Sequence, residues 1–387
     1  MSNRILFPVS IALLLFATLL SVSCGSHSQS TAADFRDTVY SPEYASGFVI
    51  LGAEGRESSL IEVSNPWQGA ENVKSRLFIA RGGESAPEGF DGQVLVGDAR
   101  RIVAMSSTHV AMLDAIGQSD RIVGVSGLDF ISNENIQRRR DQVGDVGYET
   151  ASVNYELLAS LQPDIVLLYG VSGASQMEGK LRELGIPYVY LGDYLEESPL
   201  GKAEWLVMVA ELTGSRIHGV ETFRRIPERY NAVKQLVERA DLPRPKVMVN
   251  APYGDTWFMP SRTNYSVRLI EDAGGRYIYD KVTGNASRPI DLEEAYLLTS
   301  DADLWINLGQ ARSVSDLRAM CPKFVDTKVF TSRQLYNNNR RLTPAGGNDF
   351  YESGIVRPDA VIADLARIFH PQLADSLPAP TYYKQLQ

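Results

Sequence analysis

The sequence predicts an α/β protein made of two Rossmann-like lobes, a long helical connector between them and a small N-terminal β-rich extension. Two observations lead to this fold class. Apolar strand-like runs alternate with amphipathic helices on both sides of a helical stretch, a pattern typical of βαβ units around a parallel sheet. The 387 residues are 44% hydrophobic and 22% charged, which is enough apolar material for more than one core.

Changes of pattern divide the chain into seven segments. In chain order we expect a signal peptide (1–23), a tether (24–34), the β-rich extension (35–98), an N-terminal α/β lobe (99–197), a helical connector (198–242), a C-terminal α/β lobe (243–376) and a tail (377–387). The clearest boundary is at Arg101, where a turn-rich pattern gives way to alternating strands and helices.

The extension contains four short β-type runs. Turn clusters separate these runs, which are FVILG (48–52), LIEVSN (60–65), SRLFIA (75–80) and QVLVG (93–97). Short strands joined by turns predict a small antiparallel sheet.

Each lobe repeats the same strand and helix alternation. The N-terminal lobe has strands at 101–107, 121–127, 163–170 and 186–192, with helices at 108–117, 155–161 and 177–185. The C-terminal lobe has strands at 245–252, 302–309 and 332–339, with helices at 264–274, 292–300, 314–320 and 356–373. Between them, Gly214 is expected to divide the connector helices, and Pro227 to kink the second helix or start a new one.

The N-terminal sequence is typical of a secretory signal peptide. Arg4 is the only charge before the apolar run 11–20, and small residues precede Cys24. The pattern looks like a bacterial lipoprotein signal, in which Cys24 is diacylated and becomes the first residue. The alternative is a plain secreted protein in which Cys24 is incidental. We expect the body to face the periplasm, tethered to a membrane in the cell envelope through this lipid anchor.

Several function classes lack support in the sequence. The formal charge of −9 argues against binding nucleic acid through its phosphates. No GxGxxG follows a strand and no GxxxxGK[ST] occurs, so nucleotide binding is unsupported. GVSGL (124–128) and GVSGA (170–174) miss the last glycine of the GxSxG nucleophile elbow. We therefore expect no catalytic residue, although an α/β hydrolase or a chelatase-like enzyme remains an alternative.

The histidines do not predict a resident metal site. The chain has four histidines, and a transition metal needs several donors that converge on one point. His109 alone stands just past the end of a predicted parallel strand, where ligands of open α/β sheets bind. It is therefore either a ligand contact or an ordinary residue at a helix start.

Aromatic residues recur on loops beyond the predicted strand ends of both lobes. They are Phe130, Tyr169, Tyr194, Tyr253, Trp257, Phe258 and Tyr336. A loop beyond a strand end brings a large flat side chain to the edge where a cleft forms. The recurrence favours an aromatic ligand wall over ordinary packing.

Four sequence segments occur in the order and spacing that are typical of a known protein family. They are RIVAMSSTHVAMLDAIGQSDRIVGVSG (101–127), VNYELLASLQPDIVLLYG (153–170), LRELGIPYVYLG (181–192) and RPDAVIADLARIFHPQL (357–373). Together they resemble the periplasmic substrate-binding proteins of ABC importers for ferric siderophores, haem and cobalamin. The resemblance covers about residues 100–375 and implies one ligand held between two lobes.

The resemblance also implies docking residues and shows departures. In this family an acid on each lobe docks onto arginine pockets of the permease. The matching positions here are Glu156 and Glu293, with Glu294 as a close rival. Ser107 and Ala111 stand where many members carry Pro and Glu, and Pro227 interrupts what is usually one long helix.

The implied ligand is a bulky metal chelate, and no permanently bound cofactor is expected. We favour an iron complex, either a siderophore or haem, with cobalamin as the alternative. The implied partners are an ABC permease with its ATPase, and we expect a monomer. A module that binds another envelope protein through the extension is a third possibility. The cleft candidates are Ser106, Thr108, His109, Asp129, Phe130, Tyr148, Tyr169, Tyr194, Tyr253, Trp257, Phe258, Tyr336 and Arg340.

Overall fold

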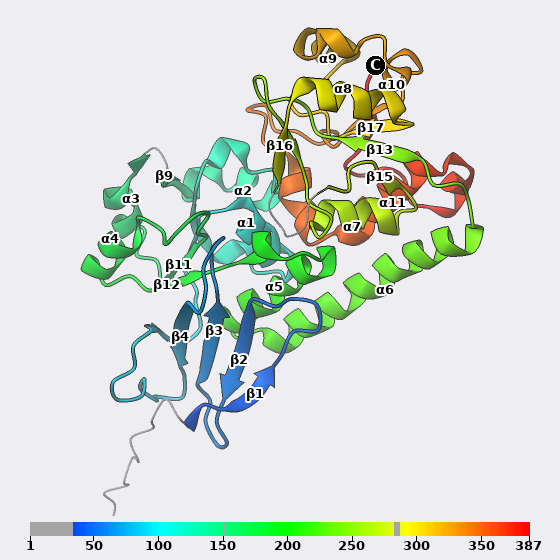
Figure 1. The fold of residues 1–387 in the computed structure, drawn as a ribbon. Helices are drawn as coiled ribbons and strands as arrows, with labels where there is room; N and C mark the ends of the chain where they lie inside the picture. The colour runs from blue at the N-terminus through cyan, green and yellow to red at the C-terminus, as the bar shows by residue number, and fades with distance from the viewer. Residues whose placement is uncertain (1–33, 150–151, 282–286) are drawn as a thin grey trace, which may run out of the picture.

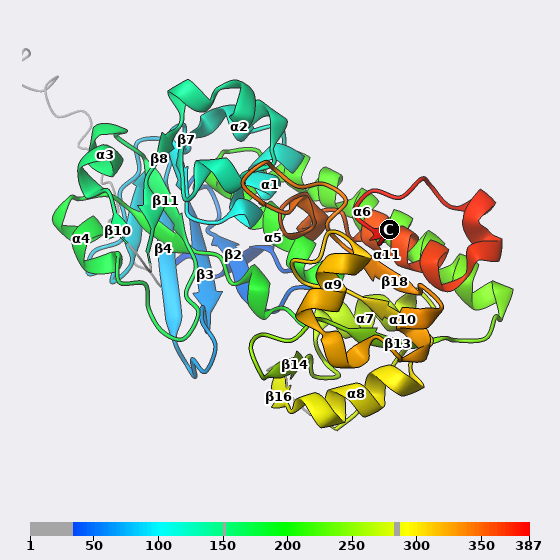
Figure 2. The same cartoon turned by 90° about the horizontal axis from the view of Figure 1, so that it is seen from above.

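A computed structural model of the chain describes residues 34–149, 152–281 and 287–387. Three five-stranded sheets lie in sequence order, one in the extension and one in each lobe (Figures 1 and 2). The signal peptide, Cys24 and most of the tether lie outside the described residues. Within those ranges no helix has the length and apolarity needed to cross a membrane.

The extension is a mixed sheet, whereas the sequence predicts an antiparallel one. Its strands are β1 (Asp37–Tyr40), β2 (Phe48–Gly52), β3 (Ser59–Ser64), β4 (Lys74–Ala80) and β5 (Gln93–Val96), paired in that order. The pairs are antiparallel except β4 with β5, which is parallel. The turn-rich stretch 81–92 explains the error, because it is long enough to carry the chain back as a crossover.

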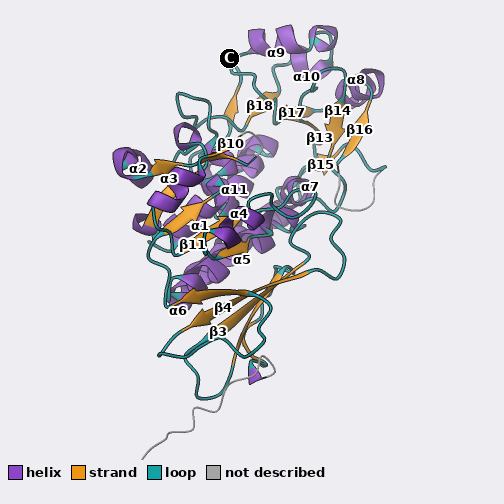
Figure 3. Ribbon diagram, turned by 90° about the vertical axis from the view of Figure 1, so that its left-hand side faces the viewer, coloured by secondary structure: helices purple, strands orange, loops and turns teal. Residues whose placement is uncertain are grey.

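The extension is packed into the rest of the molecule. One face of its sheet forms a small separate core around Phe35 and Phe78, while Ile50 and Ile61 belong to the main core. The loop before β2 is held by buried Glu204, whose carboxylate accepts the backbone N–H of Tyr44 at 2.7 Å. Such charge-assisted bonds are stronger than neutral ones, so the extension is fixed beneath the N-terminal lobe (Figure 3).

The N-terminal lobe has a five-stranded parallel sheet in the order β12-β11-β6-β7-β8. Its strands are β6 (Ile102–Ala104), β7 (Ile122–Val125), β8 (Gly144–Asp145), β11 (Ile165–Leu168) and β12 (Tyr188–Tyr190). Its helices are α1 (Ser107–Ala115), α2 (Glu134–Arg138), α3 (Tyr155–Ser160) and α4 (Glu178–Glu183), and β9 (Gly147–Tyr148) pairs with β10 (Ser152–Val153). Apart from the short edge strand β8, the sheet strands are almost wholly buried, as parallel strands covered on both faces must be.

The connector consists of α5 (Pro199–Leu212) and α6 (Arg216–Ala240), divided at Gly214 as predicted. Pro227 lies inside α6, which runs through it as one helix. The expected new start at Pro227 is therefore wrong. Phe223, Ile226 and Tyr230 are buried on either side of the proline, so tertiary packing compensates for the lost backbone hydrogen bond.

The C-terminal lobe has a sheet in the order β15-β13-β17-β18-β19. Its strands are β13 (Lys246–Val249), β15 (Arg276–Tyr277), β17 (Leu304–Ile306), β18 (Leu335–Asn337) and β19 (Lys384–Gln385), beside a ribbon of β14 (Trp257–Met259) and β16 (Arg288–Ile290). Its helices are α7 (Tyr265–Asp272), α8 (Leu292–Asp301), α9 (Val314–Met320), α10 (Lys328–Thr331) and α11 (Pro358–Phe369). The segment predicted as a tail (377–387) is part of the C-terminal sheet, because β19 pairs antiparallel with β18. Buried Asp364 holds this segment by accepting the backbone N–H of Tyr382 at 2.6 Å.

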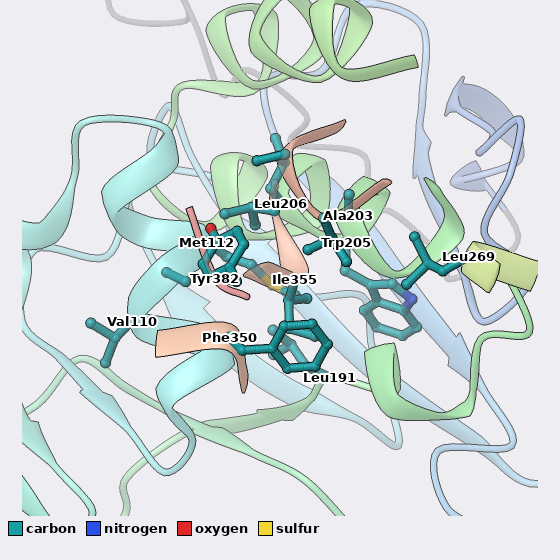
Figure 4. Close-up of a cluster of buried hydrophobic side chains, with 14 of the residues drawn as sticks. Val110, Met112, Leu191, Ala203, Trp205, Leu206, Leu269, Phe350, Ile355 and Tyr382 are labelled. Atoms are coloured by element: carbon teal, nitrogen blue, oxygen red, sulfur yellow. The ribbon is translucent and has the colours of Figure 1, made fainter. Parts of the chain in front are cut away.

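The two lobes share a buried core beneath the gap between them. Figure 4 shows Met112 of α1, Leu206 of α5, Leu269 of α7 and Ile355 of the C-terminal lobe in one cluster. Each is at most 8% exposed. Because apolar burial stabilises by about 25 cal/mol per Å², this core holds the lobes at a set separation.

Candidate functional site

The two lobes and the connector meet beside the carboxyl end of β12. Asp193 follows β12 of the N-terminal lobe, and its carbonyl oxygen accepts the Lys202 Nζ at 2.8 Å. That ammonium lies 4.6 Å from the ring centre of Tyr265, at the start of α7 in the C-terminal lobe. The N-terminal lobe, the connector and the C-terminal lobe therefore meet beside the carboxyl end of β12, the kind of sheet edge at which ligands of open α/β sheets bind.

Asp193, Lys202 and Tyr265 form what we call the floor of the cleft, which the sequence analysis did not identify. Asp193 and Lys202 are 3% and 4% exposed. Burial raises the pKa of the Asp193 carboxyl and lowers the pKa of Lys202, and the charge of each partner opposes the shift. The buried Lys202 ammonium, which donates to the Asp193 carbonyl oxygen and makes a cation–π contact with the Tyr265 ring, fixes the geometry of this junction.

The N-terminal wall contains six of the predicted residues. Ser106 caps α1 by accepting the backbone N–H of Thr108 at 3.3 Å. The rings of Phe130 and Tyr148 lie edge to face at 6.4 Å, with 48% and 42% of each residue exposed. Tyr169 is half-buried after β11, and Asp129 is exposed and bonds Arg140 at 2.7 Å.

His109 does not contact the open cleft. It is fully buried, its ring lies 6.5 Å from that of Tyr169, and its ring nitrogens are unpartnered among the described residues. Burial lowers the pKa of the imidazole to about 3, so it is neutral. The position after β6 is as predicted, but α1 turns the side chain inward.

The three aromatic residues predicted for the C-terminal wall, between residues 253 and 258, differ in exposure. Tyr253 is 83% exposed and Phe258 is 43% exposed. Trp257, between them, is fully buried, with its ring 5.5 Å from Trp305 and its Nε1 donating to the Val249 carbonyl at 2.9 Å. It is a core residue, because alternation along β14 turns it to the opposite face. We call the four exposed aromatic residues Phe130, Tyr148, Tyr253 and Phe258 the rim, and their place on the ligand cleft stays a prediction.

Tyr336 and Arg340 lie at a different place. Both line a hollow of about 430 Å³ formed entirely by residues of the C-terminal lobe, including Tyr383 and Lys384. Pairing of β19 with β18 creates this hollow. No local pattern predicts β19, and without that strand both residues were expected at the cleft.

Two asparagines at the C-terminal strand ends were missed. Asn250 follows β13 and Asn307 follows β17, with φ of 67° and 60°, a conformation that asparagine tolerates better than most residues. The Asn307 Oδ1 accepts the hydroxyl of Tyr383 at 2.7 Å. In both cases an apolar strand is followed directly by Asn, and this repeated pattern could have identified the two residues from the sequence.

The lobes also meet at what we call the clasp. Thr343 donates its hydroxyl to the Asp129 carbonyl at 2.9 Å, and the Glu352 carboxylate accepts the Ser132 N–H at 2.6 Å. Burial raises the pKa of Glu352 to about 8. A cavity of about 490 Å³ lies beside these contacts.

A larger cavity, of about 730 Å³, lies beside the floor. Predicted Tyr194 lines it together with Trp67 of the extension and Asn264 of the C-terminal lobe. The Tyr194 hydroxyl donates to the carbonyl oxygens of Gly170 and Val171.

The two acids predicted to dock the permease lie on outer helices, one on each lobe. Glu156 and Glu293 are exposed in the first turns of α3 and α8, which occupy separate sides of the molecule (Figure 1). Glu294, the rival position, is bonded to Lys281 at 2.6 Å. The geometry thus leaves Glu293 more available to a partner's arginine than Glu294.

The described residues hold no cluster of three or more His, Cys, Asp or Glu that could bind a metal ion. Cys321 is a free, buried thiol whose pKa is raised to about 12 by burial.

Residues 102–333 match the family described as periplasmic binding protein. The chain belongs to the periplasmic binding protein family. Among solved structures, a periplasmic heme binding protein from Pseudomonas aeruginosa is 17% identical, with a TM-score of 0.55 over 75% of this chain and 98% of that chain. The vitamin B12 binding protein BtuF of Vibrio cholerae is 12% identical, with a TM-score of 0.52 over 72% of this chain and 98% of that chain.

A sequence relative is the uncharacterized lipoprotein MJ0878 of Methanocaldococcus jannaschii. It is 25% identical over 283 residues, which are 70% of this chain and 65% of the relative's length. The resemblance found in the sequence and the two-lobe fold of this periplasmic binding protein are thus confirmed.

Proposed function

We propose that this periplasmic binding protein captures an iron chelate, a siderophore or haem, in its interlobe cleft and delivers it to an ABC permease. The observation that carries the proposal is the rim, where large aromatic side chains from both lobes remain exposed. Exposed aromatic groups around a concave site suit a bulky ligand with flat or apolar faces. The rim combines such faces with tyrosine hydroxyls that can bond a ligand's polar groups.

Tyrosines at the cleft also suit an iron complex. A tyrosine oxygen is one of the known protein ligands of haem iron, and Tyr148, Tyr169 and Tyr253 are exposed or half-buried at strand ends. Burial raises the pKa of Tyr148 and Tyr169, so each holds its proton and can donate a hydrogen bond. The corrinoid alternative shares the need for aromatic walls and is an outcome of the binding test.

The binding test uses the full chain in mild detergent and isothermal titration with a ferric hydroxamate, haem and cyanocobalamin. We expect saturable binding of an iron chelate at one site, with a Soret shift if haem is the ligand. Binding of cyanocobalamin alone would move the assignment to the corrinoid class. Binding of none of the three would overturn the proposal.

We further propose that Cys24 carries a lipid anchor and that Glu156 and Glu293 dock the protein on its permease. A carboxylate on a rigid lobe can accept a bidentate arginine. Reversing both charges with Glu156→Lys and Glu293→Lys should leave ligand affinity unchanged and abolish uptake by cells. Uptake that survives the double reversal contradicts this assignment.

An enzyme of similar plan is the weaker hypothesis. A serine nucleophile needs a base that takes its proton, and His109 is fully buried with the pKa of its imidazole lowered to about 3 by burial, which makes it a weak base. Ester hydrolysis that is lost in Ser126→Ala or Ser172→Ala would favour the enzyme.

A further inference from the structure

The loop between β3 and β4 leaves the extension and joins the N-terminal lobe. The Trp67 ring meets the Tyr190 ring edge to face at 5.5 Å. The Gln68 N–H lies 3.2 Å from the Val171 carbonyl and 2.9 Å from the Tyr194 hydroxyl. Tyr190 ends β12 and Val171 follows β11, so the loop is bonded to the carboxyl ends of two strands of the N-terminal sheet.

Gly170 allows this close approach. A Cβ at position 170 would lie 2.6 Å from the Gly173 carbonyl oxygen and 3.2 Å from the Trp67 Cβ, closer than real Cβ atoms are normally found. The absence of a side chain at Gly170 therefore leaves room for the tryptophan. Contacts on both sides of Trp67 hold the loop against the cleft.

The cavity of about 730 Å³ has walls from three parts of the chain. Trp67 and Gln68 come from the extension, Tyr194 from the N-terminal lobe, and Asn264 and Ser287 from the C-terminal lobe. A cavity lined by both lobes opens on the gap between them. The extension therefore enlarges the space available to a ligand of the cleft.

The acidic group in the described lining of this cavity is already hydrogen-bonded by the protein. The ionisable carboxylate that lines it, Glu196, accepts the N–H of Ser46 at 3.0 Å, the N–H of Gly47 at 3.1 Å and the indole N–H of Trp205 at 2.9 Å. No Lys or Arg belongs to the described lining. An indole face, amides and hydroxyls remain for a ligand, and these favour uncharged polar groups.

We propose that Trp67 and Gln68 form a third wall of the ligand cleft and select chelates whose periphery is uncharged and carries amide or hydroxyl groups. This inference rests on the proposed function. Trp67 covers the apolar part of such a periphery, while the Gln68 and Asn264 amides bond its polar groups. Anionic arms are disfavoured, because the cavity would desolvate them without a cation.

The test compares a neutral ferric trihydroxamate with an anionic ferric tricatecholate by isothermal titration of the full chain. We expect the wild type to bind the neutral chelate at least about tenfold more tightly. Trp67→Ala should weaken that binding about tenfold. Gln68→Lys, at an exposed position, should narrow or reverse the preference by adding a cation.

Val96→Ala is the matched control, because Val96 is on the same extension, 82% exposed and outside the cavity lining. It should change neither affinity. A wild type that prefers the anion, or a Gln68→Lys variant with unchanged affinities, overturns the third wall while leaving the proposed function intact. If Trp67→Ala does not fold, the change in chelate preference of Gln68→Lys tests the third wall by itself. A wild type that binds no chelate, haem or corrinoid overturns both proposals.

Discussion

Along the rim of the cleft, Phe130, Tyr148 and Tyr253 expose between 42% and 83% of their surface, whereas Asp193 and Lys202 at the floor are almost completely buried. At the floor the Lys202 ammonium bonds the Asp193 carbonyl oxygen and contacts the ring of Tyr265 in the opposite lobe, and at the clasp the Glu352 carboxyl group accepts a backbone N–H across the gap. Buried polar groups thus fix the lobes, whereas the aromatic side chains of the rim stay exposed. Substitutions in the two regions should therefore have separable effects on stability and on binding.

The largest expected effect on stability comes from the floor. Lys202→Met leaves Asp193 buried without its counter-charge, which should lower the free energy of unfolding by about 3–5 kcal/mol. Urea denaturation followed by circular dichroism measures this loss. Lys328→Met, which breaks an exposed ion pair with Asp303, is the control and should cause a far smaller change. Equal losses in the two variants would remove the distinction between floor and surface.

Glu352 at the clasp should make stability depend on pH. Its pKa is raised from 4.5 to about 8 by burial and by the nearby Asp349 and Asp114, and Asp349 is itself bonded to Arg341. The folded protein holds this proton between pH 4.5 and 8 while the unfolded chain releases it, so stability falls as pH rises through that range.

Denaturation at pH 5, 6.5 and 8 with Glu352→Gln, which carries no titrating proton, checks this prediction. The variant should lose most of the decline. Glu134→Gln, on an exposed residue lining the same cavity, should retain it. If the stability of the wild type and both variants falls equally with pH, the pH dependence comes from a group other than Glu352.

Removing a ring from the rim should affect binding and not folding. Tyr148→Ala and Tyr253→Ala should each weaken chelate binding by about 1–2 kcal/mol, while the urea midpoint stays near that of the wild type because both rings are exposed. Titration and denaturation of the same samples separate the two effects. A large loss of stability without loss of affinity would show that the rim is structural.

The smallest effect is expected at Glu294. Its ion pair with Lys281 is on the surface of α8, and exposed pairs contribute little. Glu294→Gln should leave stability and uptake unchanged within error, whereas Glu293→Lys on the same helix should impair uptake. Impaired uptake in Glu294→Gln would reverse the choice between these two neighbours.

The fold could be predicted from local pattern to a large extent. Alternating apolar strands and helices place the two sheets and the division at Gly214 correctly, because burial of both faces of a strand leaves a direct mark on composition. The errors arose where distant segments pair. The parallel β4–β5 pair and the addition of β19 to the C-terminal sheet depend on contacts that no local pattern encodes.

The site was predicted less completely. Position at a strand end predicted loop aromatics such as Phe130 and Tyr253, which are exposed, but it could not give the direction of a side chain, and His109 and Trp257 are buried in the core. The floor was missed because Asp193, Lys202 and Tyr265 are far apart in sequence or ordinary in composition, and only packing brings them together.

By itself the sequence determined that the chain forms two α/β lobes, that aromatic residues gather beyond their strands, and that it resembles a binding protein, since these follow from residue types and their spacing. Only the tertiary structure decided which of those aromatics are exposed, which buried polar groups hold the lobes, and that Trp67 of the extension lines a cavity together with residues of both lobes. The reason is physical: burial and ion pairing depend on which surfaces meet in space, and neighbouring residues do not specify this.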